Sequence, residues 1–478
     1  MTQREPVDLL IRHGIVLPMT QGEPVIFDGA VAVRDGRIVA IGEDASVSPT
    51  CTPAQTVDAT GKAVLPGFIN THFHFMQNFL KGSRDDCSLL DWINFVSFPR
   101  IKVVVDQYRK GNHKLHYHSA MHAGIDLLKS GVTCTVNMEW AMTPEIVDAY
   151  DKLGMRVVNT LTLTDVTSWT PPEAVLTHEQ YFSLADALIE RCKSSRDGRS
   201  EFAYGVACPN SNTEELMRKA RAQASKNGVK LHIHLAETEY ELDSIRSKHG
   251  VTPTAYMEQL GFWEEDTWAA HCIWLTPEDV EILKRHGVGV AHNPKCNMKI
   301  ADGAAPIAQM LRAGVDVGLG IDSCAVSDNT DFFEAMRTAV FLQRLVNKDA
   351  SVILGRDALR MATVGGAKTL KLDREIGTLE TGKSADLICV DLDKLNTRPY
   401  NELINNLVFA ANSSNISLVM VGGDILVENG KMVEFDEDAA LDEAEAYAED
   451  TFRQAGLELP DYFSIKRFLH SQEREKSK

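Results

Sequence analysis

Two histidines, His72 and His74, are separated by a single residue in the segment LPGFINTHFHF. Because side chains alternate along a strand, both imidazoles of such a pair point the same way, and two neutral ring nitrogens can bind one cation. A single pair of this kind is weak evidence for a metal. Further ligand-type residues, however, follow other apolar segments: His234 in HIHLAET, His271 in AAHC and Asp322 in GIDS. Their shared position at the ends of apolar segments predicts a metal site.

The elements that must position these residues are short apolar segments that alternate with segments of helical periodicity. Near-continuous apolar strands separated by helices indicate a parallel sheet buried on both faces, and eight such units favour an α/β fold, the (β/α)₈ barrel. In that barrel the carboxyl ends of the strands share one mouth, so the residues named above should converge there. The eight expected strands are residues 63–69, 132–138, 156–163, 201–208, 230–236, 267–273, 287–292 and 315–322.

Both ends of the chain have the residue pattern of β-hairpins and not of alternating strands and helices. Residues 7–43 hold β-branched runs interrupted by Asp-Gly pairs, which are typical of hairpins, and residues 385–393 and 417–433 are similar. The tail, residues 437–478, reads as an exposed helix that packs on the barrel or on a neighbouring subunit, or is only solvated. We therefore expect a small composite β-sandwich from residues 1–64 and 367–436, a catalytic barrel domain from 65–366, and a C-terminal helical tail from 437–478.

Composition narrows the classes of partner. The chain has 478 residues and a net charge of −18, from 49 Lys and Arg against 67 Asp and Glu, with no basic cluster. Such a chain repels nucleic acid and anionic membranes, which leaves a small molecule as the expected partner. The nine cysteines are scattered, as reduced thiols are, and we find neither a signal segment nor a membrane span. These features favour a cytoplasmic protein.

The motifs PGFINTHFHF, LHIHLAETE, AAHC, HNPKCN and GID together resemble those of the amidohydrolase superfamily, in particular its mononuclear-metal aminohydrolase branch. That branch includes cytosine, guanine and adenosine-type deaminases and the s-triazine hydrolases. The resemblance covers nearly the whole chain. It implies one divalent metal per chain, zinc by preference and iron as the alternative. The binuclear branch needs a lysine at the end of the fourth strand. This chain reads EFAYGVACPN there and has no lysine, so we do not expect a binuclear site. The implied ligands are His72, His74, His234 and Asp322.

The resemblance also implies the chemistry. Glu237 matches the family's proton-shuttling carboxylate, His271 the imidazole that polarises the metal-bound water, and Asp322 can accept a proton from that water. The expected enzyme is a hydrolase of C–N bonds, a deaminase in which metal-bound hydroxide attacks an amidine-like carbon of a small nitrogen heterocycle and ammonia leaves. One alternative is an s-triazine hydrolase that releases chloride or an alkylamine. The other is a catalytically silent binding or scaffold homologue, which the complete ligand set disfavours. Members of this family often form homo-oligomers.

Substrate contacts are expected from a long loop after the first strand and from the end of the seventh strand. Residues 80–102 are expected to form a long loop over the pocket, whose aromatic residues Trp92, Phe95 and Phe98 contact the substrate ring or only anchor the loop. His292 in HNPKCN corresponds to the HNPxSN segment of adenosine-type deaminases and is expected to contact substrate. We accordingly predict substrate contacts from Trp92, Arg100, Asn210 and His292.

Two of these positions depart from the adenosine-type pattern. Arg100 stands where those enzymes have a ribose-binding glutamate, and Asn210 where they have a histidine; they also carry an arginine near Leu161. Loss of a carboxylate that binds a sugar diol argues against a riboside. A cation at Arg100, together with Lys295, would instead favour an acidic or carbonyl-rich substrate.

Overall fold

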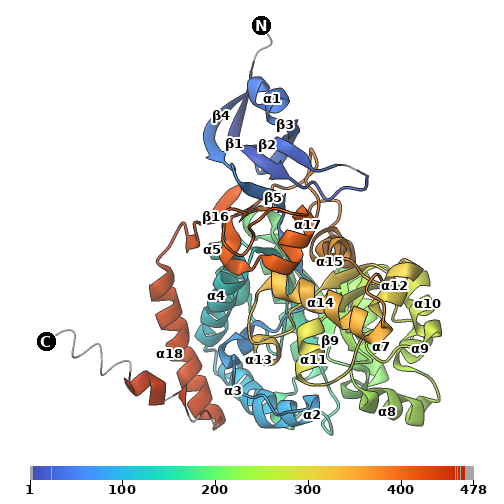
Figure 1. The fold of residues 1–478 in the computed structure, drawn as a ribbon. Helices are drawn as coiled ribbons and strands as arrows, with labels where there is room; N and C mark the ends of the chain where they lie inside the picture. Colours follow the sequence, from blue (N-terminus) through green and yellow to red (C-terminus); the bar gives the residue numbers. More distant parts are fainter. Residues whose placement is uncertain (1–3, 23, 458, 460, 463, 469–478) are drawn as a thin grey trace, which may run out of the picture.

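A computed structural model describes residues 4–22, 24–457, 459, 461, 462 and 464–468, and it contains a parallel barrel and a separate sheet (Figure 1). The barrel strands follow one another in sequence order. The main-chain N–H of Thr71 donates to Leu319 O (2.9 Å), which closes the barrel between its last and first strands. The expected α/β barrel is therefore confirmed. Its strands are β6 (Phe68–Asn70), β7 (Val132–Glu139), β8 (Arg156–Leu163), β9 (Ser200–Val206), β10 (Lys230–Leu235), β11 (Thr267–His271), β12 (Gly289–His292) and β13 (Val317–Leu319).

Helices surround the strands, and the sequence sets their ends. Helix α7 (Glu214–Asn227), for example, begins where the Thr213 side chain accepts a hydrogen bond from Leu216 N, and it ends at Gly228 with a left-handed φ of 64°. A side-chain oxygen at the first position and a glycine just past the last are the usual signals of helix boundaries. The other main barrel helices are α4 (Lys114–Lys129), α5 (Pro144–Leu153), α6 (His178–Lys193), α8 (Glu239–His249), α9 (Pro253–Gln259), α10 (Pro277–Arg285), α12 (Ile307–Ala313) and α14 (Phe332–Asn347).

The first expected strand, 63–69, is divided between two sheets. β5 (Lys62–Pro66) belongs to the separate sheet, and the barrel strand β6 starts only at Phe68. Gly67 lies at the change of sheet, where a Cβ atom would stand 2.1 Å from Thr133 Oγ1. A side chain at this position would therefore collide with β7, so glycine permits the close approach of the two sheets.

The second sheet combines both ends of the chain, as expected. β5 is its link, because it pairs with β1 in parallel and with β14 in antiparallel register. Apolar residues from both halves, such as Ile11, Val31, Leu387 and Met420, form one buried cluster. The remaining strands are β1 (Glu5–Val16), β2 (Ile26–Arg34), β3 (Arg37–Glu43), β4 (Cys51–Asp58), β14 (Leu387–Asp391), β15 (Ile416–Val421), β16 (Asp424–Glu428) and β17 (Lys431–Met432).

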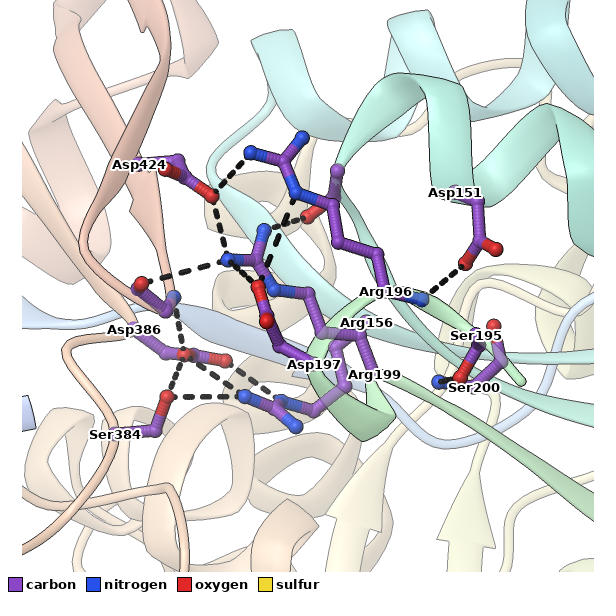
Figure 2. A network of polar contacts seen from close by, with 12 residues as sticks. Asp151, Arg156, Ser195, Arg196, Asp197, Arg199, Ser200, Ser384, Asp386 and Asp424 are labelled. Carbon is purple, nitrogen blue, oxygen red and sulfur yellow. Dashed lines mark hydrogen bonds and ion pairs between the residues drawn. The ribbon is translucent and has the colours of Figure 1, made fainter. Parts of the chain in front are cut away.

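Ion pairs join this sheet to the amino-terminal end of the barrel (Figure 2). Arg156, at the start of β8, donates from Nε to Asp386 Oδ2 (2.8 Å), and Arg199, just before β9, donates from Nη2 to Asp424 Oδ2 (2.5 Å). Both arginine side chains are largely buried. The sheet thus anchors the base of the barrel, while the carboxyl ends of the strands remain available for a functional site.

The segment expected as a loop over the pocket is mostly helical. It contains α2 (Leu89–Trp92), a π-helical turn at Ile93–Ser97 and α3 (Phe98–Arg109). Pro99 follows directly on the π-helical turn, and because proline has no N–H, the regular helical hydrogen bond is missing at this point. π-helical turns inside helices are frequent at functional sites, and this one lies over the barrel mouth. We refer to residues 89–109 as the lid.

The C-terminal tail includes α18 (Glu437–Ala455), which runs alongside α4 and α3 (Figure 1). Its Tyr447 ring stacks on His118 of α4, with centroids 4.6 Å apart. Phe452 is buried in a cluster with Trp92 and Val96 of the lid. The helix therefore packs on the barrel and supports the lid from outside. In the described part of the chain, neither α18 nor another helix combines the length and apolar character needed to span a bilayer.

Candidate metal centre and active site

Four side chains meet at the barrel mouth. His72 and His74 lie just beyond β6, His234 lies in β10, and Asp322 lies three residues beyond β13. His74 Nε2 is 3.2 Å from His234 Nε2, and Asp322 Oδ1 is 3.3 Å from His72 Nε2 and 3.5 Å from His74 Nε2. The convergence predicted from the segment ends is therefore present.

The ring nitrogens are oriented for ligation. His74 Nδ1 donates to Met138 O (2.8 Å), and His234 Nδ1 donates to Ala207 O (2.6 Å). Because a carbonyl oxygen only accepts, the Nδ1 atoms carry the hydrogens, and the Nε2 atoms of the neutral rings keep their lone pairs. His72 Nε2 is buried without a hydrogen-bond partner among the described residues. Such an orphaned nitrogen beside a carboxylate and two further lone pairs fits a divalent cation.

Burial keeps two of the four side chains, His72 and His234, neutral. Burial, and then the charges of the neighbouring histidines, hold the pKa values of His72 and His234 well below 6.5. Removing a group from water disfavours its charged form, so these imidazoles are unprotonated at neutral pH. Neutral imidazole is the form that binds a metal.

Two further groups adjoin the four. Glu237 follows β10, and His271 is the last residue of β11; their Oε1 and Nε2 atoms are 3.5 Å apart. Burial, followed by the charge of Asp322, raises the pKa of Glu237 well above its usual 4.5. Burial therefore favours the protonated form of Glu237. His271 Nδ1 lies 3.0 Å from Asn297 Oδ1, to which it donates, and this leaves His271 Nε2 as an acceptor.

The main chain at the site adopts a conformation that side chains disfavour. φ is positive at His271 (70°), at Asp322 (65°) and at Ala236 (48°), which directly precedes Glu237. Each such residue costs on the order of 1–3 kcal/mol, and residues of this kind cluster at functional sites. Hydrogen bonds hold one of these turns in place, because Asp322 N donates to His72 O (3.0 Å).

A cavity opens above these groups. Its inner end is the cluster just described, and one side is polar, with Asn210, Ser211 and Glu241. The lid and the segments after β7, β8, β12 and β13 supply an apolar wall. Among the described residues that line it there is no lysine or arginine. The wall consists of Leu89, Leu90, Trp92, Ile93, Phe98, Trp140, Trp169, Ile300 and Val326.

The aromatic residues expected over the pocket divide into two groups. Trp92 and Phe98 line the cavity, whereas Phe95 is 59% exposed and points away from the buried side of the lid. Asn210 also lines it. His292, at the end of β12, is fully buried and does not appear among the described lining residues.

The two cations expected to attract an acidic substrate are both paired. The Arg100 guanidinium faces the Glu139 carboxylate, with Nη1 and Oε1 3.4 Å apart, and both side chains are buried behind the cavity wall. Lys295 Nζ is 2.8 Å from Glu334 Oε2. Each charge is thus offset within the protein.

Comparison with known proteins decides the family. Residues 63–426 match the model of the amidohydrolase family, which is more than half of the chain. The chain belongs to that family. This amidohydrolase is 34% identical to the 5'-deoxyadenosine deaminase of Methanosarcina acetivorans, over 94% of this chain and 99% of the relative. It is also 34% identical to the 5-methylthioadenosine/S-adenosylhomocysteine deaminase of Desulforudis audaxviator, over 92% and 98%.

Solved structures show the same architecture. An adenosine deaminase from Xanthomonas campestris with bound zinc is 28% identical, with a TM-score of 0.86 over 94% of this chain and 99% of that one. The zinc-containing atrazine chlorohydrolase of Arthrobacter aurescens has a TM-score of 0.85 over 92% and 99%, at 24% identity, so that likeness concerns the fold alone. This amidohydrolase therefore has the fold on which deaminases are built.

Some cavity residues of this amidohydrolase were not predicted. Trp140 directly follows Glu139, the last residue of β7, so its position after a barrel strand was a usable signal. Glu241, four residues after Glu237 and inside α8, accepts from Ala236 N (2.9 Å), and burial raises its pKa to about 7. Both glutamates line the cavity, but Glu237 lies before α8, so helical spacing in the sequence could not relate the two carboxyl groups.

Proposed function

We propose that this amidohydrolase is a metal-dependent hydrolytic deaminase of a small nitrogen heterocycle. The observation that carries the proposal is the buried convergence of three histidine Nε2 atoms and the Asp322 carboxylate at the barrel mouth. The relatives at 34% identity are deaminases of adenosine derivatives, which supports the same reaction class.

The proposed ligands are those predicted from the sequence: His72, His74, His234 and Asp322, for zinc by preference and iron as the alternative. These residues would hold the ion, which when bound would lower the pKa of a coordinated water from about 15.7 toward about 7 and so supply hydroxide at neutral pH. The protein's own task is to hold these four groups neutral or anionic, buried and correctly oriented.

Proton transfer falls to the acidic groups. Because burial raises the pKa of Glu237 and favours its protonated form, this side chain can donate to the ring nitrogen that gains electron density when the amidine carbon is attacked. Asp322 can accept the proton that the nucleophile loses. The His271 Nε2 lone pair, 3.5 Å from Glu237 Oε1, faces the same space and orients the nucleophile. The proton accepted by Asp322 would then pass to the amino group, which leaves as ammonia, and the hydroxyl on the carbon would return a proton to Glu237 as the carbonyl forms.

Unpaired donors around the cavity indicate how the substrate is oriented. Asn210 Oδ1 accepts from Ser244 Oγ (3.0 Å), which leaves its Nδ2 atom without a partner among the described residues. The indole Nε1 atoms of Trp92 and Trp140 are likewise buried and unpaired. Buried donors need acceptors, so the cavity suits an uncharged heterocycle with ring nitrogens or carbonyl oxygens. With Arg100 neutralised by Glu139, no cationic side chain among the described lining residues favours an anion. The predicted contacts of Arg100 and His292 with substrate remain untested.

The rival activity uses the same site to release chloride or an alkylamine from an s-triazine. Ammonia and chloride assays in parallel separate the two, with 5'-deoxyadenosine, adenosine, guanine, an aminotriazine and a chlorotriazine as substrates. We expect ammonia release that depends on stoichiometric metal. Chloride release alone would favour the rival, and a purified chain that binds no metal would refute both. A cytoplasmic location and homo-oligomerisation stay predictions.

A further inference from the structure

His232 lies directly behind a metal ligand. It is two residues before His234, on the same face of β10 but one layer deeper in the barrel, and it is fully buried. Its ring stacks on Trp268 with centroids 4.5 Å apart and an angle of 15° between the planes. Its two nitrogens have defined neighbours: Nδ1 is 3.1 Å from Trp268 O, and Nε2 is 2.7 Å from His72 Nδ1.

These contacts determine where the protons lie. The Trp268 carbonyl only accepts, so His232 Nδ1 must carry a hydrogen. In a neutral ring Nε2 is then an acceptor, and His72 Nδ1 must donate to it. His72 Nε2 consequently keeps its lone pair, 3.3 Å from Asp322 Oδ1. The opposite arrangement would put a hydrogen on His72 Nε2 and direct it at the cation, which excludes ligation.

The three histidine ligands differ in what fixes their tautomer. His74 and His234 donate to main-chain carbonyls, which no side-chain substitution removes. His72 depends on a side chain. We infer that His232 is a positioning residue, which holds the proton of His72 on Nδ1 and so makes Nε2 a metal ligand. This inference rests on the metal centre of the proposed function.

Zinc affinity tests the inference without a substrate. The protein is stripped with a chelator, and zinc alone is titrated against a competing zinc-binding dye. His232→Phe keeps a flat ring on Trp268 and removes both nitrogens. Since partners that orient a metal ligand typically contribute about 10- to 100-fold to metal affinity, we expect a loss of that size. His232→Gln restores an amide oxygen that can accept from His72 Nδ1, so its zinc affinity should lie closer to wild type than to His232→Phe.

The control is His116→Phe, because His116 of α4 is equally buried but lies outside the site. It should bind zinc like the wild type. Wild-type affinity in His232→Phe, or equal weakening in His232→Gln and His232→Phe, would overturn the inference. A wild-type chain that binds no zinc would instead refute the metal centre itself. If His232→Phe does not fold, His232→Asn replaces it, since its shorter amide reaches Trp268 O but not His72.

Discussion

The buried ion pair between the barrel and the sheet allows a quantitative test of the fold. Arg156 donates from Nε to Asp386 Oδ2 (2.8 Å) and from Nη2 to Oδ1 (3.1 Å), and Asp386 also accepts from Ser384 Oγ (2.6 Å) and Gly422 N (2.9 Å). Only 13% of the Arg156 side chain and 1% of the Asp386 side chain are exposed. The substitution Asp386→Asn keeps the size of the side chain and removes its charge.

The expected cost follows from burial. Removing one partner of a buried pair leaves an uncompensated charge and costs about 3–5 kcal/mol. Because the amide oxygen introduced by Asp386→Asn would still accept one hydrogen bond, we expect the free energy of unfolding to fall by about 3 kcal/mol. The matched control is Asp393→Asn, since Arg398 and Asp393 form a pair whose side chains are each 55% exposed. An exposed pair contributes at most about 1 kcal/mol.

The pH dependence has a definite sign. Burial alone would raise the pKa of Asp386, but the charge and hydrogen bonds of Arg156 outweigh it, so the pKa lies below its usual 3.8. A carboxyl group with a lowered folded-state pKa stabilises the protein above its unfolded-state pKa, and this stabilisation is lost as the pH falls through the folded-state value. The difference between wild type and Asp386→Asn should therefore shrink below about pH 4.

Urea unfolding, followed by tryptophan fluorescence and circular dichroism, measures both variants. The expected result is a much lower midpoint for Asp386→Asn than for Asp393→Asn at pH 7. Equal midpoints for the two variants would show that the pair does not anchor the sheet to the barrel.

Three further predictions concern the site and the lid. Glu237→Gln should keep its zinc and lower kcat about 10²- to 10⁴-fold, because the amide has no proton to transfer; kcat within tenfold of wild type would exclude the proposed role. Asn210→Leu should raise KM roughly 2- to 10-fold with less effect on kcat, because one neutral hydrogen bond to substrate is lost, and an unchanged KM would show that Nδ2 does not contact substrate. Phe452→Ala removes a buried anchor of α18, worth about 3–5 kcal/mol; hydrogen exchange should accelerate in α18 and the lid, and unaltered exchange would contradict the packing role.

The convergence of the site residues could be predicted because each one lies at or just beyond the end of a recognisable barrel strand. His72 and His74 are two residues apart, and the ends of parallel strands must share one edge, so the sequence placed His234 and Asp322 beside them. Asp322 nevertheless lies beyond its strand, on a left-handed turn. No sequence pattern marked that turn, because aspartate tolerates this conformation and does not require it.

Other features of the fold depend on contacts between distant segments, which the sequence does not display. The apolar run 63–69 reads as one strand, and only the clash with Thr133 at Gly67 reveals that it changes sheet. The ion pair of Arg100 was not anticipated, because its partner Glu139 is 39 residues away and only the folded barrel brings the two together. The contact of Arg100 with substrate stays a prediction. The lid was expected as a loop, whereas residues 89–109 are helical; Pro99 lies inside this stretch, where proline normally argues against a helix.

The central claim is that this barrel holds one catalytic metal ion. A crystal of the zinc-loaded protein, measured with X-rays at the zinc absorption edge, locates such an ion directly. The account predicts one strong anomalous peak per chain at about 2.0–2.2 Å from the Nε2 atoms of His72, His74 and His234 and from the Asp322 carboxylate. No peak at that position, or a peak bound by other residues, would contradict it.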